Sequence, residues 1–144
     1  MEPLIAFPVP DPRVLRRRDE IISGLSELVD SDGLVTSLVE RRAYETDAFT
    51  AYRKVPLAVV LPRTTREVAA IRRYCHEERI PVIPRGAGTS LAGGAIPQED
   101  AVVVSLGRMN RILEIETANR FARVEAGVTN LAISDRVGPD GFFY

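Results

Sequence analysis

Two short apolar runs on either side of one capped helix place the strongest constraint on the fold. Leu57–Leu61 is a continuous apolar run, which is typical of a strand buried on both faces. Pro81–Pro84 is a second, shorter run of this type. Between them, Thr64 and Glu67 match a capping box, and the apolar stripe that follows predicts a helix to about residue 78. Because strands joined by a helix with short connections run parallel, this segment predicts a parallel βαβ unit.

The later strand patterns predict a sheet of a different kind. Ala101–Ser105 repeats the pattern of a buried strand. Residues 112–116 and 121–125 alternate apolar with polar side chains, and the residues between them supply a turn, so we expect an antiparallel hairpin. Thr129 is expected to cap a final helix to about residue 136. The predicted fold class is therefore α+β, with a small parallel βαβ subdomain followed by the start of a mostly antiparallel second sheet.

The first part of the chain is expected to form an arm and one helix. Three prolines within Met1–Pro10 predict an extended arm. Asp11 and Pro12 fit the N-cap and first position of an amphipathic helix over about residues 12–30. Residues 34–52 fit neither a helical nor a strand period, and are expected to hold a short helix and a loop.

Composition excludes several classes of protein. The chain has 144 residues, 27% of them charged and 45% hydrophobic, and a net charge of −1, as expected for a globular domain. A net charge this small gives no field that would attract nucleic acid. One cysteine and one histidine exclude an internal disulfide and a multi-cysteine or His-rich metal site. No apolar run is long enough to span a membrane and no secretory signal is visible, so we expect the cytoplasm.

The single cysteine and the single histidine are interpreted as structural residues. On the predicted helix, Cys75 lies on the apolar stripe, whereas His76 is rotated toward solvent. Neither has a neighbour in the sequence that would make it reactive. Arg16–Arg18 are interpreted as solvated charges, because adjacent helical residues spread around the helix and two acidic residues follow them.

The segment most informative about function is the glycine-rich run after the second strand. Residues 84–95 read Pro-Arg-Gly-Ala-Gly-Thr-Ser-Leu-Ala-Gly-Gly-Ala. So many glycines are unfavourable unless the backbone must adopt positive φ or approach a ligand closely. Successive N–H groups over residues 86–90, beside the hydroxyls of Thr89 and Ser90, would form a concave nest that suits a phosphate. Arg85 would add a charge-assisted contact or an ion pair.

Other glycine-rich motifs fit this segment less well. A Walker loop needs a Gly-Lys pair, and the single lysine, Lys54, lies far away in the sequence. The Rossmann fingerprint needs a glycine where Leu91 stands. A plain turn needs only one or two glycines and no Thr-Ser pair, so phosphate binding is favoured over a simple chain reversal.

The glycine-rich run resembles the diphosphate loop of FAD-binding domains of the p-cresol methylhydroxylase and vanillyl-alcohol oxidase type. The resemblance is closer still to the glycolate oxidase D subunit and D-lactate dehydrogenase group. It begins at about residue 44, and the segments that carry it are Tyr44–Asp47, Pro56–Pro62, the capped helix, the glycine-rich run, Val124–Val128 and Gly138–Tyr144.

The resemblance implies a flavoprotein that oxidises a 2-hydroxy acid, of the glycolate or D-lactate type, to the 2-oxo acid. It places the FAD diphosphate on the glycine-rich run, where two later glycines permit close approach. Members with covalently held flavin often carry a histidine near the positions of Thr89 and Ser90, and none stands here, so noncovalent FAD is expected. The cofactor-binding residues that it implies are Pro84, Arg85, Gly86, Ala87, Gly88, Thr89, Ser90, Gly93 and Gly94.

The family continues well past Tyr144, so the resemblance implies that the chain is an amino-terminal fragment. We expect an arm and a helix over residues 1–40 and an incomplete FAD-binding domain over residues 41–144. Catalytic residues are expected beyond the chain, none is nominated within it, and the fragment alone is expected to be inactive. The expected partners are the hydroxy-acid substrate of the full-length protein, and further oxidase subunits or a second copy. Two alternatives stay open: a non-redox phosphate or nucleotide module, and a structural or interaction domain.

Overall fold

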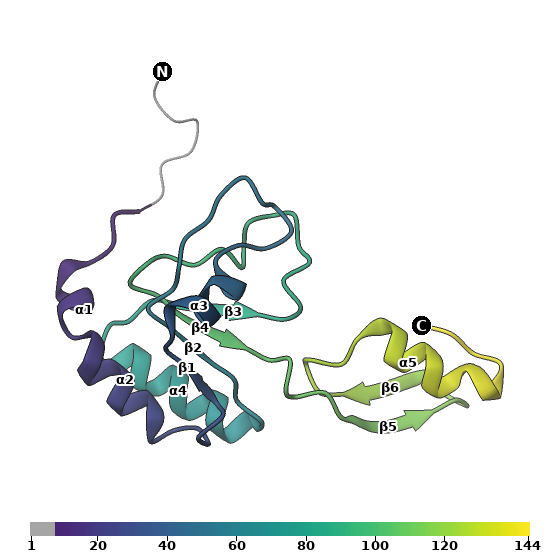
Figure 1. Ribbon diagram of the computed structural model, residues 1–144. Helices are drawn as coiled ribbons and strands as arrows, with labels where there is room; N and C mark the ends of the chain where they lie inside the picture. The colour runs from purple at the N-terminus through teal and green to yellow at the C-terminus, as the bar shows by residue number, and fades with distance from the viewer. Residues whose placement is uncertain (1–7) are drawn as a thin grey trace.

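The computed structural model describes residues 8–144, which form two lobes joined by a neck (Figure 1). The first lobe contains α1 (Pro12–Arg16), α2 (Arg18–Ser26), β1 (Leu34–Val35), α3 (Leu38–Arg41), the 3-10 helix η1 (Arg42–Tyr44), β2 (Ala58–Val60), α4 (Thr65–Glu77), β3 (Val82–Arg85) and β4 (Val102–Ser105). The second lobe contains β5 (Ile112–Glu116), β6 (Phe121–Val124), α5 (Asn130–Val137) and the 3-10 helix η2 (Gly138–Asp140). Residues 1–7 of the predicted arm lie outside the described residues. Within residues 8–144, no helix has the length and apolar character needed to cross a membrane.

The first lobe is built on a four-stranded sheet in the order β1-β2-β4-β3. β4 pairs in parallel with both of its neighbours, so that Val103 lies opposite Val59 of β2 and Ile83 of β3. β1 is an antiparallel edge strand. The predicted parallel unit is confirmed, but β4 lies between its two strands. Every residue of β4 is buried, as a central position requires, whereas Pro84 has no N–H to donate and favours the edge position of β3.

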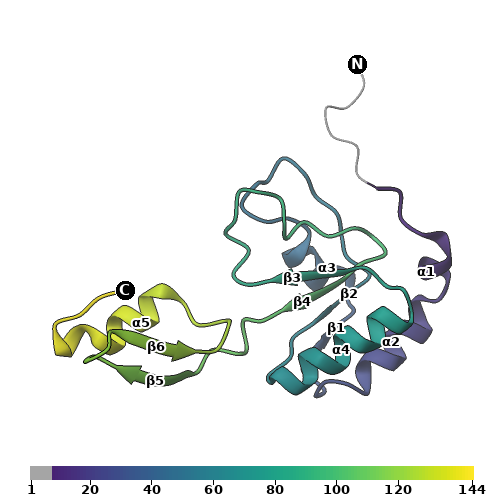
Figure 2. The same cartoon turned by 180° about the vertical axis from the view of Figure 1, so that it is seen from behind.

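The hydrophobic core of the first lobe lies between this sheet and the helices α2 and α4, which lie side by side (Figures 1 and 2). Ile21 and Leu25 of α2 are fully buried in this core. Ile71 and Cys75 of α4 are buried with them, together with residues of β2 and β4. The amino-terminal helices therefore share one core with the sheet.

The predicted helix over residues 12–30 is wrong in its extent, because it breaks at Arg17, where φ is −93° and ψ is 13°. Its start is confirmed, since the Asp11 carboxylate accepts a hydrogen bond from a main-chain N–H of the first turn at 2.8 Å. At the break, the Arg17 guanidinium donates to the carboxylate of Glu78, next to the end of α4. The chain therefore forms α1 and α2 in place of one helix, and α2 ends before residue 30.

The two helix starts that were predicted from a threonine cap are confirmed. The Thr64 hydroxyl accepts from the N–H of Glu67 at 3.2 Å at the start of α4. Thr129 accepts from the N–H of Ala132 at 3.2 Å at the start of α5. Residues 34–52 hold α3 and η1 as expected, but the prediction missed β1, because a strand of two residues shows no period.

The second lobe is an antiparallel hairpin, as predicted, with α5 packed along it (Figure 1). Its pairing contains an irregularity: β5 advances from Ile112 to Glu114 while β6 advances by one residue, so Leu113 is an extra, bulged residue. The bulge brings Ile112 and Ile115 to one face of the hairpin. On the other face, Glu114 forms an ion pair with Arg123 at 3.0 Å.

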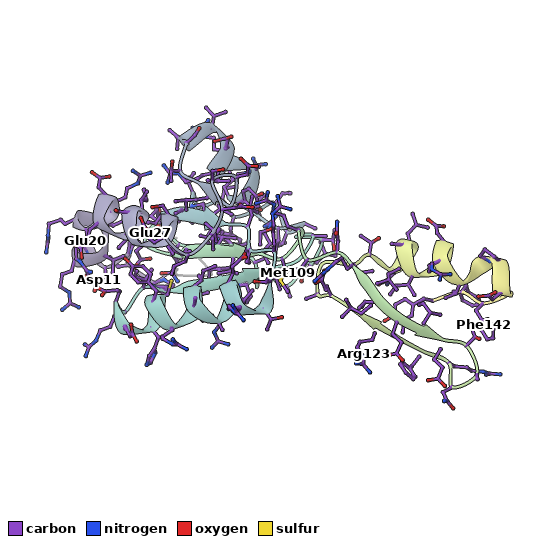
Figure 3. The ribbon with its side chains drawn as sticks, turned by 90° about the horizontal axis from the view of Figure 1, so that it is seen from below. Asp11, Glu20, Glu27, Met109, Arg123 and Phe142 are labelled. Atoms are coloured by element: carbon purple, nitrogen blue, oxygen red, sulfur yellow. The ribbon has the colours of Figure 1, made fainter. Side chains whose placement is uncertain are left out.

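The segments before β5 and after β6 run side by side in the neck. The N–H of Gly127 donates to the carbonyl of Met109 at 2.8 Å, and that of Glu125 donates to the carbonyl of Arg111 at 3.0 Å. The Arg111 guanidinium also pairs with the Glu125 carboxylate at 2.7 Å. Met109 is buried at the junction between the lobes (Figure 3). Main-chain hydrogen bonds therefore hold the neck together.

We expect Gly127→Ala to destabilise the protein at the neck. A Cβ atom at this position would overlap the carbonyl oxygen of Leu106 and stand 2.9 Å from that of Met109. Overpacking of this kind costs about 1–3 kcal/mol. Gly107→Ala is a matched control in the same neck, because a Cβ atom there meets nothing within 4 Å. Equilibrium urea unfolding compares the two variants, and equal stability would contradict this description of the neck.

Candidate functional site

The glycine-rich run forms part of the connection from β3 to β4. Because these strands are parallel neighbours, residues 86–101 must carry the chain back to the start of β4. The connection contains no helix or strand, and it lies on the side of the sheet away from α2 and α4 (Figures 1 and 2). The segment over residues 45–57 lies beside it, and the N–H of Ala48 donates to the carbonyl of Ser90 at 3.1 Å. Two loops that are far apart in the sequence therefore support each other.

The main-chain N–H groups of the glycine-rich run are not used by the protein itself. Within the described part of the chain, no N–H from Gly86 to Ser90 donates a hydrogen bond to another protein group. The next N–H to donate is that of Ala92, which is bonded to Ser90 Oγ at 3.1 Å. Gly88 adopts φ +73°, a conformation that favours glycine. The donors that a phosphate nest requires are therefore present, and their binding to phosphate stays a prediction.

Most of the predicted cofactor-binding residues are accessible to a ligand. Pro84 and Arg85 end β3. The exposed members are Pro84, Gly86, Ala87, Thr89, Ser90 and Gly94, and the half-buried ones are Arg85, Gly88 and Gly93. A Cβ atom on Gly86 or on Gly94 would meet nothing within 4 Å, and neither has positive φ. The chain itself therefore does not require glycine at these two positions, whereas a ligand at van der Waals distance from the backbone would require it.

The Arg85 side chain is held by the protein. Its Nη1 donates to the carbonyl of Thr46, 39 residues earlier, at 2.7 Å. Its guanidinium carbon lies 5.6 Å from the centroid of the Tyr44 ring, within the range of a cation–π contact. Among residues 8–144, no carboxylate lies within ion-pair distance of it. The ion pair that the sequence allowed is therefore not formed, and a main-chain carbonyl and an aromatic ring are its partners.

The segment that supports the loop was not identified as functional from the sequence. The Lys54 ammonium pairs with the Glu99 carboxylate at 2.7 Å, and this hydrogen bond lowers the pKa of Glu99. The N–H of Lys54 donates to the carbonyl of Glu45 at 2.8 Å and closes the segment into a loop. Asp47 is buried, and its Oδ1 accepts from the N–H of Phe49 at 2.9 Å. The only sequence signal for this segment was the resemblance that begins near residue 44.

Cys75 and His76 are placed as predicted and lie outside the glycine-rich loop. Cys75 is fully buried in the core, and this burial raises the pKa of its thiol to about 11. His76 is exposed on α4. In the region from residue 8 to residue 144, no three His, Cys, Asp or Glu side chains are grouped as a metal site requires.

Comparison with protein families decides the class of the protein. The family model described as FAD binding domain matches residues 56–144. The chain belongs to this FAD-binding family. The match includes the glycine-rich loop, the neck and the second lobe, and it confirms the expectation of an FAD-binding domain with FAD as its cofactor. It does not favour the two alternatives, a non-redox phosphate module and a purely structural domain.

The curated relatives of this FAD-binding chain confirm the expected subgroup. The chain is 43% identical over 127 residues to glycolate oxidase subunit GlcD of Escherichia coli K12, a match that covers 88% of this chain and 26% of that protein. It is 42% identical over 104 residues to GlcD of Bacillus subtilis, covering 72% and 22%. It is 31% identical over 121 residues to a probable mitochondrial D-2-hydroxyglutarate dehydrogenase of Oryza sativa, covering 84% and 22%. The chain thus spans about a quarter of the length of these relatives.

Solved structures confirm the expected fold. A crystal structure of p-cresol methylhydroxylase with substrate bound matches with a TM-score of 0.76 at 21% identity, covering 92% of this chain and 26% of that chain. 4-Ethylphenol oxidase from Gulosibacter chungangensis matches with a TM-score of 0.77 at 28% identity, covering 92% and 26%. The predicted α+β fold of the p-cresol methylhydroxylase type is therefore correct.

Cys75 is expected to resist labelling by Ellman's reagent at pH 8 in the folded protein and to react once urea unfolds it. The reason is that Cys75 is fully buried, which excludes the reagent and also raises the pKa of the thiol to about 11, so that it stays protonated. Because the pKa of Cys75 is higher in the folded than in the unfolded protein, the thiol does not lower the free energy of unfolding below pH 9.0. Above that pH, the free energy of unfolding falls as the pH rises toward about 11. Rapid stoichiometric labelling of the folded protein would contradict the burial of Cys75.

Proposed function

We propose that the full-length protein is an FAD-dependent oxidoreductase that oxidises a 2-hydroxy acid, of the glycolate or D-lactate type, to the 2-oxo acid. The proposal concerns the full-length protein, because the chain spans about a quarter of its curated relatives. The names of those relatives, glycolate oxidase and D-2-hydroxyglutarate dehydrogenase, support a 2-hydroxy acid as the substrate class. We assign no catalytic residue within this chain, and expect the chain alone to be inactive.

The role of this chain is to hold the FAD diphosphate on residues 84–94. The observation that carries this assignment is the row of unused N–H groups from Gly86 to Ser90, because such donors bind phosphate oxygens when they converge in a loop. Ser90 Oγ already accepts from the N–H of Ala92, so its own O–H remains available to donate. The Thr89 hydroxyl is exposed beside it. When bound, FAD supplies the electron acceptor for oxidation of the substrate α-carbon.

We propose that FAD is held without a covalent bond by this loop. The support is chemical: no histidine stands between residues 84 and 95, and His76 lies on α4. After denaturation of the full-length protein in trichloroacetic acid and proteolysis, no flavin should therefore be found on a peptide from residues 84–95. Flavin absorbance on such a peptide would contradict this assignment.

The remaining assignments concern partners, compartment and domain division. The hydroxy-acid substrate is the partner of the full-length protein, and the naming of GlcD as a subunit supports further oxidase subunits, with self-association as the alternative. We retain the cytoplasm as a proposal about the compartment of the full-length protein. We retain the division into residues 1–40 and residues 41–144 as a proposal about sequence segments, although α2 of the first segment shares a core with the four-stranded sheet.

Gly86→Ala tests the diphosphate assignment directly. A Cβ atom there meets nothing in the protein, so the fold should be retained, and a change at such a site stabilises by about 0.4–1 kcal/mol. The same atom would stand where the diphosphate approaches the backbone, so FAD affinity should fall by about tenfold or more. Gly107→Ala introduces the same methyl group into similarly open space outside the loop and should leave FAD affinity unchanged.

The measurement is titration of the apo form of the full-length protein with FAD, followed by flavin fluorescence, together with thermal unfolding. Equal FAD affinity in Gly86→Ala and in Gly107→Ala would overturn the assignment of the diphosphate to this loop. A full-length protein that binds nucleotides but shows no flavin absorption after reconstitution would favour the non-redox phosphate module.

A further inference from the structure

We propose that Arg85 is a positioning residue for the glycine-rich loop, which it braces from the protein side. The inference rests on the proposed function, because it concerns how the same loop is held in shape for FAD. It differs from the simplest interpretation of an arginine in such a loop, namely that its charge binds a phosphate oxygen.

Two contacts, and the space that it fills beside Gly88, place the Arg85 guanidinium between two segments of the chain. Its Nη1 donates to the carbonyl of Thr46 at 2.7 Å. Its central carbon lies 5.6 Å from the centroid of the Tyr44 ring. Its Nε would stand 2.9 Å from a Cβ atom at Gly88, so the guanidinium occupies the space that a side chain at Gly88 would need. Arg85 therefore joins the segment over residues 44–46 to the middle of the loop.

The position of Gly88 makes this contact important for the N–H groups on either side of it. Gly88 has φ +73°, and this left-handed residue turns the backbone in the middle of residues 86–90. No hydrogen bond from an N–H of these residues holds that turn, as described above. The guanidinium against Gly88, and the hydrogen bond from Ala48 to the carbonyl of Ser90, are the contacts that support it.

The present partners of Arg85 occupy only part of its guanidinium. Its Nη1 donates to the carbonyl of Thr46 and its plane lies near the Tyr44 ring, while its Nε and Nη2 lie on the side of Gly88. The guanidinium also has no carboxylate partner among the described residues, so its full positive charge stays beside the loop. That charge attracts a diphosphate through space without any contact.

The braced position is specific for arginine. A planar guanidinium stacks on a ring and donates in its plane at the same time, whereas a lysine ammonium is a point charge that cannot fill both roles. A phosphate contact alone would also favour arginine, but it would not depend on the Tyr44 ring. The coupling between Arg85 and Tyr44 therefore tests the bracing role.

The experiment is a double-mutant cycle on FAD affinity in the full-length protein. The variants are Arg85→Lys, Tyr44→Leu, the combination of both, and Tyr44→Phe, which keeps the ring face. We expect Arg85→Lys to weaken FAD binding about tenfold or more and Tyr44→Leu to weaken it several-fold, with the double variant no worse than Arg85→Lys alone. Tyr44→Phe should bind FAD as the unmodified protein does, because its ring still faces the guanidinium. Arg53→Lys, the same change at an exposed arginine of the supporting loop, is the matched control.

The outcomes separate the inference from the function on which it rests. Fold-changes that multiply in the double variant, or a Tyr44→Leu variant with unchanged affinity, would show that Arg85 acts on FAD without Tyr44 and would overturn the positioning role. If Arg85→Lys fails to fold, the comparison of Tyr44→Leu with Tyr44→Phe still decides, because equal affinities would overturn the role. A full-length protein that binds no FAD before any substitution would overturn the proposed function itself.

Discussion

The parallel pairing of β3 with β4 is the constraint on which the rest of this structure depends. Two neighbouring parallel strands require a connection that returns from the end of the first strand to the start of the second. Such a connection is usually a helix, whose backbone N–H and C=O groups form hydrogen bonds with each other. Here residues 86–101 make the return without a helix or strand. Their backbone therefore keeps N–H groups free at the place where β3 ends. The feature that a ligand would use is a direct result of the topology of the sheet.

A loop whose N–H groups from Gly86 to Ser90 donate no hydrogen bond to the protein must be held in shape there by other parts of the chain. In this protein the support comes from one segment, which lies between η1 and β2 and is far away in the sequence. It contacts the loop and its continuation through Ala48 with Ser90, Lys54 with Glu99, and Thr46 with Arg85. The first of these uses a carbonyl of the loop and the others use side chains. The support therefore leaves the N–H groups from Gly86 to Ser90 unoccupied.

Local sequence rules predicted the elements of this fold well where the signal lies within a few residues. Thr64 and Glu67 fixed the start of α4, and Asp11 fixed the start of α1, because a cap bonds to the first turn that follows it. The position of β4 between β2 and β3 was not predictable, since strand order depends on contacts between segments distant in the sequence. The break at Arg17 was not predictable for the same reason, because its partner Glu78 lies next to the end of α4, far away in the sequence.

The candidate site shows the same division between local and distant causes. The glycines and hydroxyls of residues 86–90 predicted unused N–H groups from the composition of the loop alone. The orientation of Arg85 was not predictable, because it depends on Tyr44 and Thr46 being brought to the end of β3 by the fold. Sequence reasoning gave Arg85 the partner that its charge favours in solution, namely an anion. In the folded protein, its partners are the Tyr44 ring and the carbonyl of Thr46.

The glycines of this chain differ in the physical reason for which the protein needs them, and the differences support the proposed diphosphate site. Gly127 is required by its own backbone neighbours, because a Cβ atom would overlap the carbonyl of Leu106. Gly88 is required by its positive φ and by the Arg85 guanidinium. Gly86 has neither reason, since its φ is ordinary and the space beside it is open. Gly107 has the same open space, but Gly86 differs from it in lying beside unused N–H groups, and this supports the proposal that a nucleotide diphosphate lies against the backbone there.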